Sequence, residues 1–325
     1  MSKIWFKCLL ALITATVLTA HAQNERLIKT DEVKVARAQA ALKKDEVCTK
    51  CHDESENAPV LSLYQTKHGV RGDARTPTCQ SCHGTSDNHV KGASDGKGRP
   101  SPDVVFKKGA YTASGENERA DQCLTCHKDT RRHNWDGGAH QTNGVACNSC
   151  HQVHRPQDKV LSKKTQPEVC YTCHKEQRAD ARKISHHPIN EGKVVCSDCH
   201  NPHGSTGQKL LKKNTINETC QTCHAEKRGP MLFEHQPVTE ACTHCHTPHG
   251  SNINALLKSR PPFLCRECHD GTHGSAGPVG RNAAGIQGGL TKSTGPSATE
   301  VGRGCTNCHV QVHGSNSPAG GFLQR

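Results

Sequence analysis

The sequence is poor in the residues that normally build a hydrophobic core. Only 3% of the 325 residues are aromatic and 32% are hydrophobic, and the whole chain contains two tryptophans and two methionines. These shares lie below those of an ordinary soluble domain. Composition therefore excludes a conventional core made of side chains, and it predicts a loop-rich chain unless another apolar body provides the core.

Long apolar runs are also missing after the first twenty residues. Lys3 and Lys7 precede an apolar run from Cys8 to Ala20, which ends in Ala20-His21-Ala22. This pattern is typical of a cleaved secretory signal peptide, predicted here as residues 1–22. A membrane-spanning helix needs about 20 apolar residues, so the run is too short for an anchor. We expect export from the cytoplasm and no helix that spans a bilayer.

Cysteine is plentiful, yet none is left over for a structural disulfide. Apart from Cys8 in the predicted signal, every cysteine belongs to the pattern Cys-x-x-Cys-His, which occurs ten times. This pattern is the attachment site of haem c: both thiols form thioethers to the porphyrin, and the histidine becomes the proximal iron ligand. The sequence therefore predicts ten covalently bound haem c groups.

The attachment residues can be read directly from the motifs. The predicted haem-binding cysteines are Cys48, Cys51, Cys79, Cys82, Cys123, Cys126, Cys147, Cys150, Cys170, Cys173, Cys196, Cys199, Cys220, Cys223, Cys242, Cys245, Cys265, Cys268, Cys305 and Cys308. The predicted proximal iron ligands are His52, His83, His127, His151, His174, His200, His224, His246, His269 and His309. No residue is predicted to be catalytic.

Other uses of Cys-x-x-Cys fit this chain less well. A disulfide or a redox dithiol requires no histidine after the second cysteine, and here all ten copies have one. Zinc is the stronger alternative, because two cysteines, one histidine and a remote histidine can form a tetrahedral site. Adjacent Cys and His converge poorly on one ion, however, and zinc fingers separate their Cys and His pairs by about a dozen residues. Haem is therefore favoured over zinc.

Ten porphyrins would provide the apolar core that the side chains lack. We therefore expect a multihaem cytochrome c with a mostly irregular chain, short α-helices, almost no sheet and a core formed by the haems. The net charge of +12 would normally suggest nucleic acid as a partner. About twenty haem propionates explain the Lys and Arg residues more simply, as their ion-pair partners. We therefore predict no nucleic-acid binding.

The part of the chain before the first motif differs from the rest. A weak apolar stripe behind Asp31 predicts an N-terminal helical lead over residues 23–47. Two stretches between motifs, Gly84 to Gly115 and Gly274 to Gly304, are rich in Gly, Ser and other small or polar residues. Both are predicted to be surface loops.

The spacing of the motifs predicts how the haem-binding part is divided. Between Cys123 and Cys265 successive motifs begin 22 to 26 residues apart, which is typical of a repeat array. Residues 48–325 are predicted to form one decahaem domain built of five two-haem units. The units cover residues 48–122, 123–169, 170–219, 220–264 and 265–325.

Histidines outside the motifs are numerous enough to give every iron a sixth ligand. Six follow a motif closely, several within His-Gly-Ser runs, and four precede alternate motifs by seven to eleven residues. The predicted distal ligands are His68, His89, His140, His154, His186 or His187, His203, His235, His249, His273 and His313. His133, His244 and one of His186 and His187 are surplus. Aligning Pro188 with Pro237 matches His186 to His235 and favours His186.

Full ligation predicts an electron carrier rather than an enzyme. An iron with two protein ligands has no open position for a substrate. Methionine is nearly absent, and only Met231 follows the predicted signal, so His/Met ligation is excluded for at least nine of the haems. Because bis-histidine ligation gives low reduction potentials, the centres are suited to couples near those of quinol pools and iron minerals.

The motif count and two stretches around the motifs resemble a known family. His186 to Ser205 contains His-His-Pro-Ile and Cys-His-Asn-Pro-His-Gly-Ser, and Glu234 to Val238 precedes another motif. With ten motifs behind a signal peptide, the chain resembles the periplasmic decahaem c-type cytochromes of porin–cytochrome conduits, the MtrA, MtoA, PioA and DmsE family. The resemblance covers essentially the whole mature chain, which lacks the long N-terminal extension of the PioA type.

The resemblance implies an elongated row of closely spaced haems that is partly inserted in an outer-membrane β-barrel porin. It implies a periplasmic location in association with the outer membrane, and an inner-membrane or periplasmic cytochrome or quinol-linked electron partner. An extracellular multihaem cytochrome, a mineral or soluble iron would be the outer partner. The implied function is iron(II) oxidation, or the reduction of iron(III), other minerals or dimethyl sulfoxide, with the direction of electron flow open.

Two other functions stay open from the sequence. A soluble periplasmic electron shuttle would use the same ligands and differ only in lacking association with the membrane. A multihaem reductase would need a five-coordinate haem, which is often attached at a variant of the motif such as Cys-x-x-Cys-Lys. None of the ten motifs departs in this way, which makes the reductase the weakest of the three functions.

Overall fold

The computed structural model describes most of the chain beyond the first motif. The described residues are 32–33, 36, 39, 43–52, 60–69, 76–92, 98–128, 132–269, 305–318 and 320–323. The predicted signal peptide, His273 and the loop from Gly274 to Gly304 lie outside them. Within the stretch predicted as a helical lead, the described residues are helical.

The chain forms two compact units. Unit 1 combines residues 1–128 with 143–161, and unit 2 combines residues 129–142 with 162–325. The four motifs that begin at Cys48, Cys79, Cys123 and Cys147 belong to unit 1, and the other six belong to unit 2. The division into five two-haem units is finer than this and stays a prediction.

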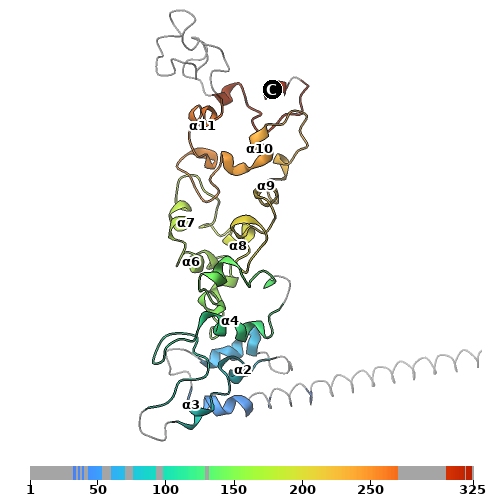
Figure 1. The fold of residues 1–325 in the computed structure, drawn as a ribbon. Coiled ribbons are helices and arrows are strands. Elements are labelled where there is room, and N and C mark those ends of the chain that lie inside the picture. The colour runs from blue at the N-terminus through green and yellow to red at the C-terminus, as the bar shows by residue number, and fades with distance from the viewer. Residues whose placement is uncertain are drawn as a thin grey trace, which may run out of the picture. The chain divides into compact units, whose positions relative to one another are not determined.

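Short helices alternate with irregular chain in both units (Figure 1). Unit 1 contains η1 Val60–Gln65, η2 Lys67–Gly69, α2 Cys79–His83, α3 Asp87–Lys91, α4 Glu116–Leu124, η4 Cys147–Ser149 and η5 Lys159–Leu161. Unit 2 contains α5 Ala139–Thr142, α6 Gln166–Cys170, α7 Lys175–Asp180, α8 Cys196–Cys199, η6 Gln208–Leu210, α9 Ile216–Cys220, η7 Ala225–Lys227, α10 Gln236–Glu240, η8 Cys242–His244, η9 Asn254–Leu256, α11 Phe263–Arg266, η12 Cys305–Asn307 and η13 Gly320–Phe322. Among the described residues strand pairing is limited to isolated bridges. The predicted fold class is confirmed.

The motifs explain where many of these helices begin and end. The motifs that open each predicted two-haem unit lie at the end of a helix, as at Cys170 in α6 and Cys220 in α9. The motifs that close a unit begin a helix, as at Cys79 in α2 and Cys196 in α8. In both cases one helical turn carries the motif: the His174 N–H, for example, donates to the Cys170 carbonyl at 3.0 Å.

The two variable residues of a motif follow this difference. In closing motifs, Ser81 and Asp198 accept the backbone N–H of the residue before the first cysteine, at 3.0 and 2.9 Å, which caps the start of the helix. In opening motifs, Thr125 and Thr172 instead donate a side-chain hydrogen bond to a carbonyl in the preceding turn. The residue type at a variable position therefore depends on whether the motif begins or ends a helix.

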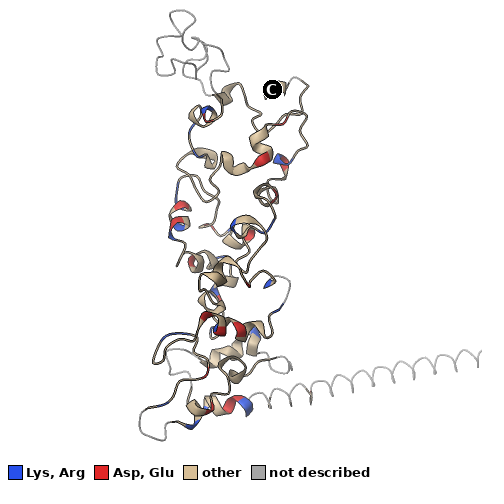
Figure 2. Cartoon of the chain, in the orientation of Figure 1, with Lys and Arg blue, Asp and Glu red and all other residues tan. Residues whose placement is uncertain are grey.

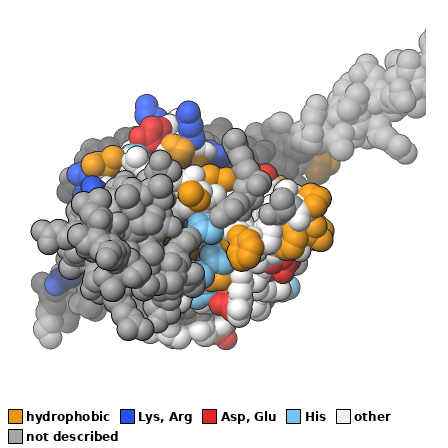
Figure 3. Space-filling view, turned by 90° about the horizontal axis from the view of Figure 1, so that it is seen from above, with side chains coloured by type: hydrophobic (Ala, Val, Ile, Leu, Met, Phe, Trp, Pro, Cys, Tyr) orange, Lys and Arg blue, Asp and Glu red, His pale blue; other side chains and the backbone are white. Residues whose placement is uncertain are grey.

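The side-chain core is small, as the composition predicts. The buried hydrophobic residues among the described part are Val104, Ala120, Trp135, Ala146, Tyr171, Ala181 and Val195. Larger apolar side chains lie exposed close to predicted ligands, and Ile184, Leu232 and Phe263 are 80%, 64% and 66% exposed. Figure 3 shows histidine side chains reaching the surface beside hydrophobic ones. Such apolar surface needs a cover, which a flat porphyrin beside the ligand would provide.

Charged residues of both signs are distributed along the two units (Figure 2). Many of the ion pairs in the described part join residues three or four apart, such as the exposed pair Lys50 with Glu46, which contributes little to stability. None of the described helices has the length and hydropathy of a membrane span.

Candidate haem-binding sites

Motif histidines face histidines from elsewhere in the chain. Within the described residues, at least eight pairs join a predicted proximal ring to a predicted distal ring of the same unit, with ring centres 5.9–6.3 Å apart. The pairs in unit 1 are His52–His89, His127–His68 and His83–His154. The pairs in unit 2 are His174–His140, His224–His187, His200–His249, His269–His235 and His246–His313.

This separation fits two ligands on opposite sides of one metal ion. Two metal–nitrogen bonds of about 2 Å, with about 1 Å from each nitrogen to its ring centre, add up to about 6 Å. The angle between the ring planes varies widely, from 14° in His246–His313 to 80° in His140–His174. Axial coordination explains both facts, because rotating a ring about the bond to iron leaves the distance unchanged. The residues therefore fit a bis-histidine haem.

The outer ring nitrogen of many ligands is held by a backbone carbonyl. Distal rings donate through Nδ1 at 2.7–2.8 Å in His89 to Pro100, His140 to Pro202, His187 to Pro248 and His235 to Val312. Proximal rings do so at 2.6–3.0 Å in His83 to Val104, His200 to Lys209, His246 to Ala255 and His309 to Phe322. A carbonyl only accepts, so Nδ1 carries the proton. The Nε2 lone pair is therefore free for the iron.

Unusual backbone conformations bring two of these carbonyls into place. Lys209 in η6 and Ala255 in η9 have φ angles of 54° and 58°, in the left-handed region that non-glycine residues rarely adopt. Their carbonyls accept from His200 and His246. Such a conformation costs about 1–3 kcal/mol. Because it occurs at two equivalent places, each beside a ligand ring, we infer that it serves to hold that ring.

Burial keeps several ligand rings neutral, which is the form that binds iron. It lowers the pKa of His83 and His154 in unit 1, and of His249 and His313 in unit 2. Desolvation is the largest cause in each case, because a charged imidazolium loses its water on burial. These four rings therefore carry no charge near neutral pH.

The structure places His187, and not the favoured His186, opposite a motif histidine. The His187 ring lies 6.3 Å from that of His224. Both nitrogens of His186 are engaged elsewhere, Nδ1 with the Lys183 carbonyl at 2.5 Å and Nε2 with Glu191 at 3.4 Å. These two contacts raise the pKa of His186, the carbonyl having the larger effect. His187, directly before Pro188, faces a motif histidine as His235 does, whereas aligning the two prolines would match His235 to His186.

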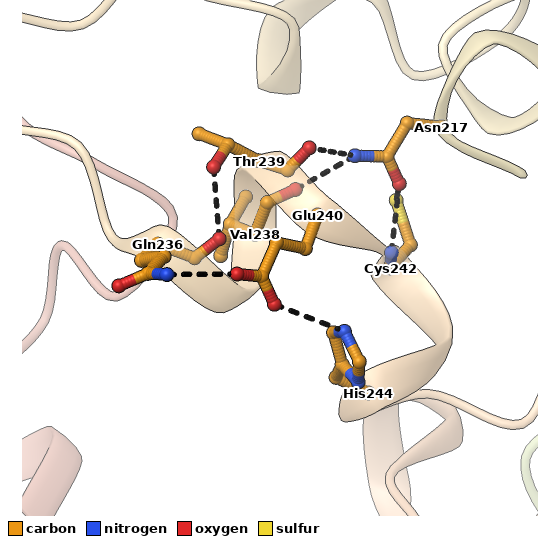
Figure 4. A network of polar contacts seen from close by, with 7 residues as sticks. All are labelled: Asn217, Gln236, Val238, Thr239, Glu240, Cys242 and His244. Carbon is orange, nitrogen blue, oxygen red and sulfur yellow. Dashed lines mark hydrogen bonds and ion pairs between the residues drawn. The ribbon is translucent and has the colours of Figure 1, made fainter. Parts of the chain in front are cut away.

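The other uncertain histidines divide into three groups. His203 is described in unit 2, where its backbone N–H donates to Asn201 at 3.2 Å, and it stays a predicted ligand. His273 lies outside the described residues and also stays a prediction. Of the histidines predicted as surplus, His133 is exposed, and His244 Nε2 lies 3.4 Å from a Glu240 oxygen (Figure 4).

Thiols of consecutive motifs lie next to one another along each unit. The first cysteines lie near enough for one thiol to affect the pKa of the other in the pairs Cys48–Cys79, Cys123–Cys147, Cys170–Cys196, Cys220–Cys242 and Cys265–Cys305. The second cysteines interact electrostatically in the pairs Cys82–Cys126, Cys199–Cys223 and Cys245–Cys268. The two contact types alternate. Each motif is therefore next to the motifs before and after it in the same unit.

A buried amide joins the two motifs of one such pair. Asn217 in α9, three residues before Cys220, donates to the carbonyls of Val238 and Thr239 at 2.8 and 3.0 Å (Figure 4). Its oxygen accepts the backbone N–H of Cys242 at 2.8 Å. Asp45, three residues before Cys48, makes the same kind of bond to the N–H of Cys79 at 2.8 Å. In these two pairs, the side chain three residues before the opening motif therefore holds the start of the next motif.

The His-Gly-Ser runs gain a structural explanation that the sequence did not provide. After His249, a side chain at Gly250 would collide with the Asp180 carbonyl, and Ser251 forms a backbone bridge with Ser185. The carbonyl before His249, that of Pro248, accepts from His187. The run thus fastens the distal ligand of one motif to the distal ligand of the next. Its recurrence after His203 and His313 was the signal that could have revealed this contact.

The comparisons with known proteins agree with this geometry. Residues 186–229 and 235–274 match the doubled CXXCH motif family, and residues 79–167 match the family of cytochrome c-type proteins like NrfB. The chain is 43% identical to the multiheme cytochrome MtrA of Shewanella baltica over 100% of its own length and 94% of that protein. It is 30% identical to the cytochrome c-type protein NrfB of Escherichia coli over 42% of its length and 68% of that protein. The chain belongs to the MtrA family of multihaem c-type cytochromes, which carry electrons.

Proposed function

We propose that this chain is a wire of ten bis-histidine haems that carries electrons between the periplasm and the cell exterior. Its proximal and distal ligands are those predicted from the sequence, with His187 in place of His186. His203 and His273 complete the distal set. An outer-membrane β-barrel porin surrounds part of the wire.

The observation that carries the proposal is that consecutive motifs are neighbours within each of the two compact units. In unit 1 the thiol contacts run from Cys48 to Cys79, from Cys82 to Cys126 and from Cys123 to Cys147. In unit 2 they continue in the same alternation to Cys265 and Cys305. Haems attached there would lie close to their predecessors and successors. This supports electron hopping in sequence order and the division into five two-haem units.

The ligand geometry supports an electron carrier without a substrate site. In the eight described pairs both axial positions of an iron would be filled by imidazoles, which leaves no open position for catalysis. When bound, the haems supply one-electron chemistry. The chain holds eight of the described ligand imidazoles in the correct tautomer through backbone carbonyls on Nδ1, so little reorganises when an electron arrives.

The need for a porin follows from the surface of the chain. A polypeptide this rich in irregular backbone cannot lie in lipid, because its polar groups would be unsatisfied there. A barrel around it would shield it across a hydrocarbon layer of about 30 Å. The inner partner would be a periplasmic or inner-membrane cytochrome linked to quinol. The outer partner would be an extracellular multihaem cytochrome, soluble iron or a mineral, in iron(II) oxidation or in the reduction of minerals or dimethyl sulfoxide.

Fractionation of native membranes tests the conduit. Outer membranes would be washed with high salt and separated on a haem-stained gel, and the band of this chain would be followed with its intact mass. We expect retention with a barrel-sized partner and a mass that accounts for ten haems. Release into the soluble fraction with all ten haems would contradict the conduit and favour the periplasmic shuttle.

A spectrum of the same preparation tests the alternative of a reductase. Six-coordinate bis-histidine haems are low-spin in both oxidation states. A five-coordinate haem would add a high-spin ferric signal. We expect no such signal in the intact protein, and its presence would revive a catalytic role.

A further inference from the structure

His151 differs from the other closing-motif histidines in what holds its outer nitrogen. Its Nδ1 donates to Asp158 Oδ2 at 2.6 Å. In the described residues the corresponding nitrogens of His83, His200, His246 and His309 donate to backbone carbonyls. A carboxylate carries a full negative charge and a carbonyl only a dipole, so the bond to Asp158 is charge-assisted and stronger.

The local chain explains why a side chain replaces a carbonyl here. Asp158 follows His151 by seven residues, whereas Lys209 follows His200 by nine. The shorter loop lacks the left-handed turn that aims the Lys209 carbonyl at its ring. The Asp158 side chain is only 16% exposed, and its other oxygen accepts the Val160 N–H at 3.3 Å. Its own loop therefore holds the carboxylate in position.

We propose that Asp158 lowers the reduction potential of the haem attached at Cys147 and Cys150 below the potentials of haems whose proximal ring donates to a carbonyl. The carboxylate attracts the Nδ1 proton of His151 and makes the ring more basic. The ring then donates more electron density to iron through Nε2. Oxidised iron has the greater positive charge and gains more from this donation than reduced iron, so gaining one electron becomes less favourable. Asp158 is a positioning residue that acts through His151.

The position of this haem gives the effect a consequence for transport. The motif at Cys147 begins η4, which packs against α4 with the motif at Cys123, so this haem has a close neighbour in unit 1. An electron arriving from that neighbour would enter a centre that is harder to reduce, and the step would limit the rate along the row. The proposal rests only on the electron-carrier part of the proposed function, and it holds with or without a porin.

Spectroelectrochemical titration of the purified holoprotein tests the proposal. Asp158→Asn keeps the size of the side chain and removes its charge. We expect the variant to carry the full set of haems by intact mass, and one haem's share of the titration to move to higher potential. The expected change is about tenfold in its ratio of reduced to oxidised form at fixed potential, which is about 59 mV for one electron. Asp158→Glu, which restores a carboxylate, should return the curve toward the wild type.

Asp103→Asn is the matched control. Asp103 is also a carboxylate near a closing motif, and it accepts the Ser86 N–H at 2.7 Å rather than a ring nitrogen. Its titration curve should overlay that of the wild type. A curve for Asp158→Asn identical to the wild type, or a shift equal to that of Asp103→Asn, would overturn the proposal. If Asp158→Asn matures without a full set of haems, Asp158→Ser gives the same comparison with a smaller neutral side chain. The outer-membrane fractionation is independent of these results.

Discussion

A haem ligand in this protein depends on both nitrogens of its ring. One nitrogen must keep a lone pair for iron, and the other must hold a proton against an acceptor, as His187 does against the Pro248 carbonyl. His186, one residue away, has both nitrogens occupied by polar groups of its own loop. Each such hydrogen bond contributes about 1 kcal/mol, but its main effect is to select the tautomer.

The neighbouring histidines 186 and 187 provide a matched pair of variants. His187→Ala should convert one haem from low-spin to high-spin, because its iron loses the sixth ligand. His186→Ala should leave the spectrum unchanged, because it removes only the local contacts with the Lys183 carbonyl and Glu191. Electron paramagnetic resonance of the ferric protein measures both. A high-spin signal from the His186 variant, with none from the His187 variant, would reverse the assignment.

The turns after distal histidines carry glycine for a steric reason. Gly204 has a φ angle of 104°, and a Cβ atom there would lie 1.8 Å from the Asn134 carbonyl oxygen. Gly314 has a φ angle of 120°, and a Cβ atom there would lie 2.6 Å from the Met231 side chain. Because glycine has no side chain, the turn after one distal histidine can contact the segment that leads to the next distal ligand. In this chain close contacts at glycine turns hold neighbouring segments together, as side-chain packing does in an ordinary core.

We expect Gly204→Ala to destabilise the holoprotein by about 3 kcal/mol, since the backbone must move as well as adopt a strained angle. Gly192→Ala is the control, because Gly192 also has a positive φ, of 70°, but has no atom within 4 Å of the added Cβ. It should cost only about 1 kcal/mol. Thermal melts followed by the haem spectrum compare the two. Equal loss in both variants would show that the contact with Asn134 is unimportant.

The amide of Asn217 is expected to decide whether the next motif is in place for haem attachment. Asn217→Ala would leave the Cys242 N–H and two carbonyls without partners, at about 1–3 kcal/mol for each buried group. Intact mass should then reveal a fraction of molecules that lack one haem. Gln236→Ala, which removes only an exposed bond to Glu240, should keep the full set. Full occupancy in the Asn217 variant would argue against this role.

The described part of the molecule buries too few apolar side chains for us to expect it to fold without haem. The buried hydrophobic residues of the described part are few and mostly small, and Ile184 and Phe263 are exposed beside predicted ligands. A porphyrin buries far more apolar area than any of these side chains. Folding and haem attachment are therefore expected to be one process, as in small metal domains that are unfolded without metal.

Withholding haem tests this dependence. The mature chain, produced in a compartment without haem attachment, should give the circular dichroism of an unfolded polypeptide and show no cooperative thermal transition. The holoprotein should show helix and a cooperative melt. A folded haem-free chain with protected amide protons would contradict the expectation and would require a core that the described residues do not reveal.

The attachment cysteines and proximal histidines are predicted from the sequence because the haem-attachment motif is local. Cys-x-x-Cys-His needs only five consecutive residues, and distal histidines recur at regular distances from it. Eight predicted distal ligands do lie across from motif histidines in the structure. The structure favours His187 over His186 through a carbonyl 61 residues away, at Pro248. The alignment of prolines carried no information about that contact.

Short motifs and composition are enough to predict the cofactor class and the irregular chain with short helices. The tertiary fold alone shows which rings face each other, which carbonyls select their tautomers and which motifs are neighbours within a unit. It also decided that His151 donates to the Asp158 carboxylate where its counterparts donate to carbonyls. These features depend on loops that return to a ligand from a distance. Loop length and backbone angles set such contacts, and neither leaves a periodic signal in the sequence.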